Sequence, residues 1–231
     1  MRPPETAKNR AWYVRRLVDR TPEPELMEDV AQAEAYARAD FDTPNEAFVD
    51  RFLATFPDFV RGSIVDLGCG PADIPLLLAR RLPDVRVTGV DGSAAMLAPG
   101  RAAVEAFGGR VVLVEGTLPN AVAGRFDAVI SNSLLHHLHD PDVLWAEVVR
   151  VANPGAVVLV ADLFRPENGD AVDRLVEQYA ANEPEVLRRD FRNSLHAAFT
   201  TEEIEAQLAR HGLALEVERI SDRHVAIHGT L

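Results

Sequence analysis

The sequence has one cysteine, Cys69, among its 231 residues. A single thiol cannot form an intramolecular disulfide, and it cannot supply a zinc site built from several thiolates. No apolar run approaches the roughly 18 residues that a membrane-spanning helix needs. The first residues are charged and polar, whereas a secretory signal has an apolar core there. We therefore expect a cytoplasmic protein that does not enter a membrane.

Positive charge is also scarce, with 24 basic against 36 acidic residues and a net charge of −12. This charge opposes the approach of a polyanion, so nucleic acid is not expected as a general partner. The first 20 residues are a local exception, because their basic residues outnumber the acidic ones, and they leave a tRNA partner weakly open. The length and the average composition indicate one large domain, as a monomer or homodimer.

Two helices are expected near the N-terminus. Residues 23–39 are rich in good helix formers and hold the aromatic Tyr36. A capping box with proline at the first helical position, Thr43-Pro44-Asn45-Glu46, begins a second helix that ends at Pro57. We expect residues 1–60 to form a tail and a helical lid, and residues 61–231 to form the main domain.

From Ser63 onward, short β-branched runs alternate with helical stretches. This pattern is typical of a parallel sheet with helices on both faces, because parallel strands need crossover connections. The predicted strands span 64–67, 85–90, 110–114, 126–131 and 156–162, and the predicted helices lie near 73–82, 93–107 and 141–152. Asn153-Pro154-Gly155 is expected to end the last of these helices.

The last quarter of the chain differs from this alternation. Residues 166–199 read as a mostly helical insertion, and a further helix follows over 200–210. Strands at 214–220 and 224–229 are joined by a short turn, so they must pair antiparallel. The expected fold is therefore α/β and Rossmann-like: a mainly parallel sheet of seven strands that ends in an antiparallel hairpin.

A glycine-rich turn lies between the first strand and the first helix of the series, in Asp66-Leu67-Gly68-Cys69-Gly70. Glycines two apart at such a junction let a ligand lie against main-chain amides. Asp91 follows 21 residues after Gly70, at the end of the next strand, where a carboxylate can accept hydrogen bonds from ribose hydroxyls. These features fit NAD and S-adenosylmethionine (SAM) equally well.

Three further features favour SAM. Asp73 stands where a dinucleotide motif has its third glycine, and its charge opposes a pyrophosphate. Asp66 and Asp73 together suit the ammonium and sulfonium groups of a cationic cofactor. The terminal antiparallel hairpin also separates this sequence from dinucleotide-binding folds.

On these motifs, residues 45–231 resemble the class I SAM-dependent methyltransferases. Asp66 to Gly70 match the family's first motif, Asp91 matches its ribose-binding acid, and residues 126–138 match its fourth-strand motif. The resemblance implies SAM as cofactor and a small-molecule methyl acceptor. It implies cofactor contacts from Asp66, Gly68, Cys69, Gly70, Asp73, Asp91, Gly92, Ser93, Met96, Gly116, Thr117, Leu118, Ser131 and Asn132.

The loop after the fourth strand holds His136 and His137. An imidazole beside the methyl donor can take the proton of the acceptor, and His137 is preferred over His136 for this role. No metal site is expected, because His136, His137 and His139 have no evident carboxylate partner. Candidates to line the acceptor pocket are Tyr36, Phe41, Ser133, Arg165, Tyr179, Arg192 and His196.

Other functions remain open at this point. The same fold could modify the cofactor itself, as in a carboxy-SAM synthase. A regulatory protein could bind SAM without catalysis. An NAD-dependent oxidoreductase is disfavoured by Asp73, and an RNA methyltransferase is held open only by the basic N-terminus.

Overall fold

The computed structural model describes residues 19–23 and 42–231. Most of the helix expected over 23–39, together with Tyr36 and Phe41, lies outside the described residues. Within the described part, no helix is both long enough and apolar enough to cross a bilayer.

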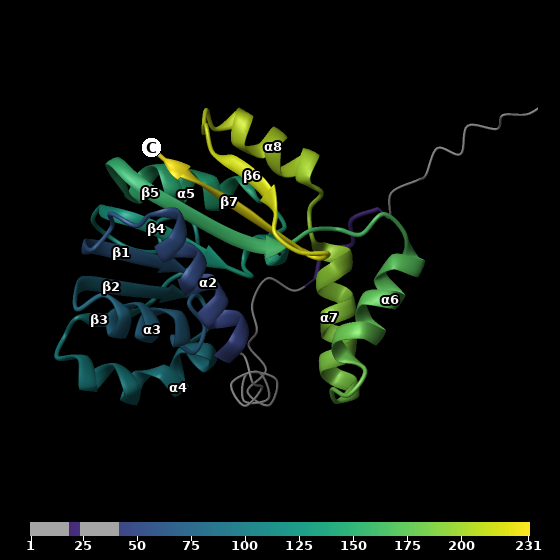
Figure 1. The fold of residues 1–231 in the computed structure, drawn as a ribbon, viewed down its shortest axis with the longest axis horizontal. Coiled ribbons are helices and arrows are strands. Elements are labelled where there is room, and N and C mark those ends of the chain that lie inside the picture. The colour runs from purple at the N-terminus through teal and green to yellow at the C-terminus, as the bar shows by residue number, and fades with distance from the viewer. Residues whose placement is uncertain (1–18, 24–41) are drawn as a thin grey trace, which may run out of the picture.

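One seven-stranded sheet forms the centre of the molecule, with the strand order β3-β2-β1-β4-β5-β7-β6 (Figure 1). β1 to β5 are parallel, while β7 pairs antiparallel with both β5 and β6. This arrangement confirms the predicted fold class. The strands are β1 Arg61–Leu67, β2 Asp84–Asp91, β3 Val111–Glu115, β4 Phe126–Asn132, β5 Ala152–Leu163, β6 Glu216–Arg219 and β7 His224–Thr230.

Helices cover both faces of the sheet because side chains alternate between the faces along each strand. On one face, Phe48 and Phe52 of α2 pack with Leu78 of α3 against Ile64 and neighbouring strand residues. On the other face, Trp145 of α5 and Ile204 of α8 join a second apolar core. These helices are α2 Asp42–Thr55, α3 Asp73–Arg81, α4 Ala94–Val104, α5 Asp142–Val151 and α8 Thr201–Arg210.

The insertion predicted over 166–199 forms two helices, α6 Gly169–Ala180 and α7 Glu185–Ala197. They stand together beyond the end of the sheet toward which β5 runs (Figure 1). Val172, Val176 and Leu195 form a small core between them. The pair therefore lies beside the carboxyl ends of the parallel strands, where open α/β sheets bind ligands.

Several element boundaries differ from the prediction. The helix α5 ends before Asn153-Pro154-Gly155 as expected, but β5 begins at Ala152, four residues earlier than predicted, so these residues belong to the strand. The pairing of β4 with β5 shifts register between Phe126 and Ala128, and this irregularity absorbs the proline and glycine within the strand. β1 begins three residues earlier than expected, and β6 is shorter than expected, at Glu216–Arg219.

Candidate functional site

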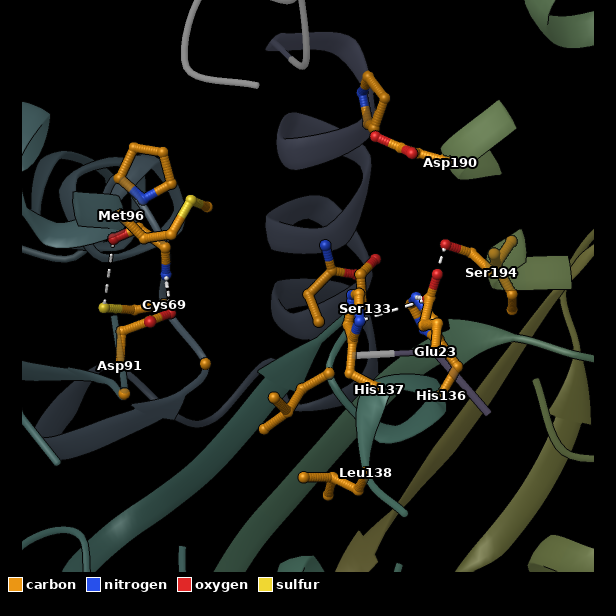
Figure 2. Close-up of a pocket in the computed structure, with 18 of the residues that line it drawn as sticks. Glu23, Cys69, Asp91, Met96, Ser133, His136, His137, Leu138, Asp190 and Ser194 are labelled. Carbon is orange, nitrogen blue, oxygen red and sulfur yellow. Dashed lines mark hydrogen bonds and ion pairs between the residues drawn. The ribbon is translucent and has the colours of Figure 1, made fainter. Parts of the chain in front are cut away.

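A cavity of about 910 Å³ opens at the carboxyl ends of the parallel strands. Figure 2 shows Cys69, Asp91 and Met96 at one end of it, and Glu23, His136, His137 and Ser194 at the other. The first group follows β1 and β2. The second group joins the loop after β4 to α7 and to the segment 19–23. We call these two ends the glycine-turn end and the histidine end.

The glycine-turn end begins where β1 leaves the sheet. Gly68 and Gly70 have φ values of 78° and 52°, a backbone conformation that favours glycine. The backbone amides of Gly68 and Cys69 donate to the carbonyl of Val90 at 2.7 and 2.9 Å, which ties the turn to β2. A side chain at Gly68 would meet Leu134 at 3.0 Å, so the turn can pass this close to the loop after β4 only as glycine.

Asp91 closes the other side of this turn. Its carboxylate accepts hydrogen bonds from the backbone amides of Gly70 at 2.9 Å and Ser93 at 2.8 Å. Burial raises the pKa of Asp91, and these two hydrogen bonds partly oppose the rise. A carboxylate has about four lone-pair sites, so Asp91 retains acceptor capacity toward the cavity. It can therefore hold the turn and a pair of ligand hydroxyls at once.

Asp66 is the most unusual group at this end. The residue is 1% exposed, and neither carboxylate oxygen has a hydrogen-bond partner among the described residues. Burial, reinforced by the negative charge of Asp91, raises the pKa of Asp66 to about 8. A buried carboxyl group without a partner costs free energy unless a ligand satisfies it. Asp66 therefore provides a site for a positively charged or hydrogen-bond-donating ligand group.

The loop after β3 completes the glycine-turn end with Gly116, Thr117 and Leu118, all of which line the cavity. The buried carboxylate of Glu147 on α5 anchors this loop, because it accepts from the backbone amides of Asn120 at 2.8 Å and Ala121 at 3.0 Å. A flat, apolar ligand group can thus lie between this loop and Met96.

The histidine end is built on the 3-10 helix Leu135–His137. His136 is buried, and its Nδ1 lies 2.5 Å from Oδ1 of Asp162 on β5. Burial by itself lowers the pKa of His136, but the charge and hydrogen bond of Asp162, with the charge of Glu23, produce a net rise. The neighbouring ring of His137 stacks on His136 with 4.1 Å between centroids, and its side chain is 27% exposed.

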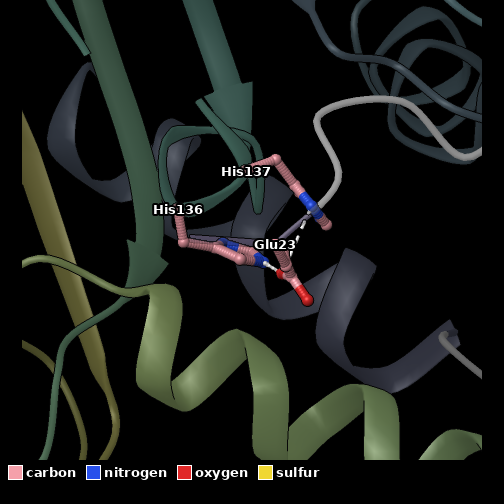
Figure 3. A group of neighbouring side chains, drawn as sticks. All are labelled: Glu23, His136 and His137. Atoms are coloured by element: carbon pink, nitrogen blue, oxygen red, sulfur yellow. Dashed lines mark ion pairs between the residues drawn. The ribbon is translucent and has the colours of Figure 1, made fainter. Parts of the chain in front are cut away.

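Glu23 brings a carboxylate to these two rings. Its Oε1 lies 3.3 Å from Nδ1 of His137 and 3.6 Å from Nε2 of His136 (Figure 3). The hydroxyl of Ser194 on α7 donates to the same oxygen at 3.0 Å. The side chain of Glu23 is only 12% exposed, and burial raises its pKa while the charge of His136 opposes the rise.

Arg20 holds this segment in place. Its guanidinium donates to the carbonyls of His136 at 3.1 Å, Leu138 at 2.7 Å and Ala197 at 2.6 Å. It also lies over the ring of Phe199, 3.9 Å from the centroid. Arg20 thus links the segment 19–23 to the loop after β4 and to the end of α7. These contacts position Glu23 beside the two histidines.

Most of the site residues predicted from the sequence line the cavity. At the glycine-turn end these are Asp66, Gly68, Cys69, Gly70, Asp73, Asp91, Gly92, Met96, Gly116, Thr117 and Leu118, and further along the cavity Asn132, Ser133, His136, His137 and Tyr179.

The structure does not bring the others into this cavity. Ser131 is buried and donates to the carbonyl of Leu67, whereas Ser93 caps α4. Arg165 is buried against the carbonyl of Ala198 and pairs with Glu203 at 2.6 Å, and His196 borders a separate, smaller cavity. Arg192 is exposed and pairs with Asp173. Tyr36 and Phe41 lie outside the described residues.

Sequence reasoning missed Glu23, Asp162 and Ser194. Asp162 carried a usable signal, because it ends the strand next to β4 and parallel neighbours bring their carboxyl ends together. Glu23 and Ser194 carried none, since only the tertiary packing brings 19–23 and α7 to the histidines. Other missed lining residues are Pro44, Asn45, Glu183, Arg189, Asp190, Arg223 and His224.

Comparison with known proteins adds three findings. Residues 64–155 match the family described as methyltransferase domain. A trans-aconitate 2-methyltransferase of Azoarcus sp. (strain BH72) is 36% identical over 109 residues, covering 47% of this chain and 42% of that protein. A ribosomal RNA small subunit methyltransferase C of Cronobacter sakazakii is 32% identical over 123 residues, covering 51% and 36%. The chain thus spans less than half the length of these curated relatives.

The fold also matches solved structures. The plantazolicin methyltransferase BpumL, in complex with a triazolic desmethylPZN analog and SAH, superposes with a TM-score of 0.66 at 13% identity. The match covers 87% of this chain and 89% of that one. It therefore extends beyond residues 64–155 of the family match.

Proposed function

We propose that this chain, whose residues 64–155 match a methyltransferase domain, is a class I SAM-dependent methyltransferase that transfers the methyl group of SAM to a small-molecule acceptor. The observation that supports the proposal most strongly is the buried carboxyl group of Asp66 beside the glycine turn, which has no hydrogen-bond partner in the part of the chain that the structure describes. A cationic ligand satisfies such a group by favouring its ionised form, whereas a pyrophosphate would oppose that ionisation.

The residues at the glycine-turn end fit SAM in three respects. Asp66 suits the charged methionine part of the cofactor. Asp91 retains lone pairs for two ribose hydroxyls while it holds Gly70 and Ser93. Met96 and the loop at Gly116 to Leu118 border a slot for adenine. NAD fits this turn less well, because Asp73 occupies the helix start that would receive its phosphates.

SAM supplies an electrophilic methyl group on a sulfonium. The protein has to hold the acceptor atom in line with the sulfur–carbon bond and keep water away. The acceptor's lone pair forms the new bond, the sulfur keeps the electron pair of the broken bond, and any acceptor proton must leave. His137 lies at the cavity with its side chain partly exposed, so we retain it as the candidate general base, with His136 held behind it by Asp162.

A small acceptor is favoured over RNA for two reasons. The first is the position of the cavity, which lies between the sheet and the helical pair α6 and α7 and so suits a small molecule. Tyr179 and Ser194 are among its lining residues. The net charge of −12 also opposes a polyanion. The relatives include both kinds of enzyme, because one is a trans-aconitate methyltransferase and another a ribosomal RNA methyltransferase. A location in the cytoplasm remains our expectation from the sequence.

Calorimetric titration with S-adenosylhomocysteine (SAH) tests the proposal first. We expect micromolar binding that is lost in Asp91→Ala, and no binding of NADH. The matched control is Asp127→Ala, because Asp127 also accepts backbone and side-chain hydrogen bonds but does not line the cavity. Binding of NADH in place of SAH would overturn the assignment.

Methyl transfer is then assayed with radiolabelled SAM against small carboxylic acids, phenols, amines and tRNA. Label in an extractable small molecule supports the proposal. Label in tRNA alone would contradict the small-molecule part. A carboxylated cofactor detected by mass spectrometry would favour a carboxy-SAM synthase, and tight SAH binding without turnover on any acceptor would favour a regulatory protein.

A further inference from the structure

We propose that Glu23, His136 and His137 form a binding site for a divalent transition-metal ion at the histidine end of the cavity. One carboxylate oxygen and one nitrogen from each ring all lie within 4.8 Å of one another (Figure 3). The sequence analysis expected no metal because the histidines lacked a carboxylate partner, and Glu23 supplies that partner from a distant part of the chain.

The distances suit coordination better than direct ion pairing. Oε1 of Glu23 lies 3.6 Å from Nε2 of His136 and 3.3 Å from Nδ1 of His137. Hydrogen bonds from nitrogen to oxygen are usually about 2.7–3.2 Å long, so both contacts are longer than a good hydrogen bond. Ligand atoms about 2.1 Å from a tetrahedral zinc ion lie ~3.4 Å apart, which falls between the two separations.

The outer contacts are also those of a metal site. A histidine ligand normally donates its other ring N–H to a carboxylate, which fixes the tautomer and orients the ring. Asp162 lies 2.5 Å from Nδ1 of His136 in this role, and Nε2 is left directed at Glu23. The Glu23 carboxylate is in turn oriented by the hydroxyl of Ser194 at 3.0 Å. With Nδ1 protonated, Nε2 and the Glu23 oxygen are both lone-pair atoms, and a cation between them satisfies both.

The ligand set specifies the kind of ion. Two imidazoles with one carboxylate suit zinc, iron(II) and similar transition ions, whereas magnesium prefers oxygen ligands. Three protein ligands leave at least one position for water or an acceptor oxygen, as in catalytic zinc sites. Since the three residues line the same cavity as Asp66 and Asp91, an acceptor with a hydroxyl or carboxylate oxygen is the class that such an ion would orient.

This inference gives the two histidines a task other than proton transfer. The ion lowers the pKa of a bound acceptor hydroxyl, which releases its proton to solvent before its oxygen forms the bond to the methyl carbon. That catalytic consequence depends on the proposed methyltransferase function. The binding of the ion does not, so the two are tested separately.

The test is zinc binding by the 231-residue chain after chelator treatment and dialysis. We measure bound metal by mass spectrometry, and affinity for ZnCl₂ by competition with a chromophoric chelator. We expect one zinc ion per chain, and a loss of affinity of about tenfold or more in Glu23→Gln and in His137→Ala. These two variants avoid the fully buried His136, and circular dichroism checks that they fold.

The matched control is His228→Ala. His228 also faces a glutamate, Glu218 at 3.8 Å, and does not line the cavity. It should bind zinc as the wild type does. MnCl₂ and MgCl₂ are titrated in parallel, and magnesium should bind at least about a hundredfold more weakly than zinc.

Two results would overturn the metal site. One is a wild-type protein that binds no zinc although it binds SAH. The other is zinc affinity that is unchanged in both Glu23→Gln and His137→Ala. A protein that binds zinc through these residues but does not bind SAH would retain the metal site and refute the methyltransferase proposal.

Discussion

Asp162 contacts His136 through both carboxylate oxygens, one at the ring and one at the backbone amide. Its Oδ1 lies 2.5 Å from Nδ1 of the ring, and its Oδ2 accepts from the backbone amide at 3.2 Å. The pair is buried, and it joins the end of β5 to the loop after β4. Burial alone would raise the pKa of Asp162, but the charge of His136 and the hydrogen bond with its ring outweigh this effect, so the pKa of Asp162 is lower than usual. The orientation of the histidine end is therefore set from the neighbouring strand.

We expect Asp162→Asn to reduce methyl transfer at least tenfold while SAH affinity changes by less than about twofold, because the amide lacks the charge and one of the two acceptor oxygens that orient His136. The protein should also lose about 1–3 kcal/mol of stability, since a buried imidazole is left poorly paired. Single-turnover assays and urea unfolding measure the two effects. Unchanged turnover would mean that the ring of His136 does not need the carboxylate of Asp162 to orient it.

Asp66→Asn should stabilise the folded protein and weaken SAH binding. Burial and the charge of Asp91 raise the folded pKa of Asp66 to about 8. The unfolded value is about 4, so wild-type stability falls as pH rises between these values, because only the folded state keeps the proton. The advantage of the variant should therefore grow by roughly 1 kcal/mol per pH unit between about pH 5 and 8.

Urea unfolding at several pH values across that window measures the advantage. Parallel pH profiles for the two proteins would show that Asp66 ionises normally in the fold. Isothermal titration with SAH, run alongside, should show loss of affinity in the variant at every pH tested.

Gly68→Ala and Gly108→Ala separate backbone strain from crowding. Both glycines have positive φ, 78° and 59°, and each substitution should cost about 1–2 kcal/mol for that reason. A Cβ at Gly68 would also meet Leu134 at 3.0 Å, whereas one at Gly108 would meet no described residue within 4 Å. Only the Gly68 variant should lose SAH affinity, and an equal loss in both would contradict a local role for the turn.

Arg20→Ala should release the segment that holds Glu23. Loss of three hydrogen bonds to carbonyls costs at least ~2 kcal/mol, so amide exchange in residues 19–23 should rise about 30-fold. Turnover and zinc affinity should fall, whereas SAH affinity should not. Arg81→Ala is the control, because Arg81 is exposed and pairs only with Asp50 among the described residues. Unchanged exchange would show that other contacts hold the segment.

The fold and the glycine-turn end were predictable because their signals are local. β-branched runs mark the strands, and Gly68, Gly70 and Asp91 stand at fixed distances from strand ends. The short turn near Ser221 forces the antiparallel hairpin. The helix before Asn153-Pro154-Gly155 ends as predicted, but the predicted start of the next strand was wrong, because a register shift allows these residues to belong to β5.

Only some of the residues at the histidine end could be predicted from the sequence. The positions of His136 and His137 follow from the motif after β4, but Glu23 comes from a segment more than a hundred residues away. Arg165 illustrates the opposite error. Its side chain is predicted from the sequence to line the acceptor pocket, but its guanidinium donates to the carbonyl of Ala198 and to the carboxylate of Glu203. Such outcomes depend on tertiary packing, which leaves no periodic trace in the sequence.

The residues that line the cavity come from inside and outside the region that matches the family. The glycine turn, Asp91 and the loop at Gly116 fall within the matched region 64–155, whereas Glu23 and the lining residues of α6 and α7 fall outside it. The glycine-turn end is thus the part shared with the matched family, and the α6–α7 pair is a separate unit beside it. Replacing this pair with the corresponding helices of a relative should change which compound is methylated and leave SAH affinity unchanged.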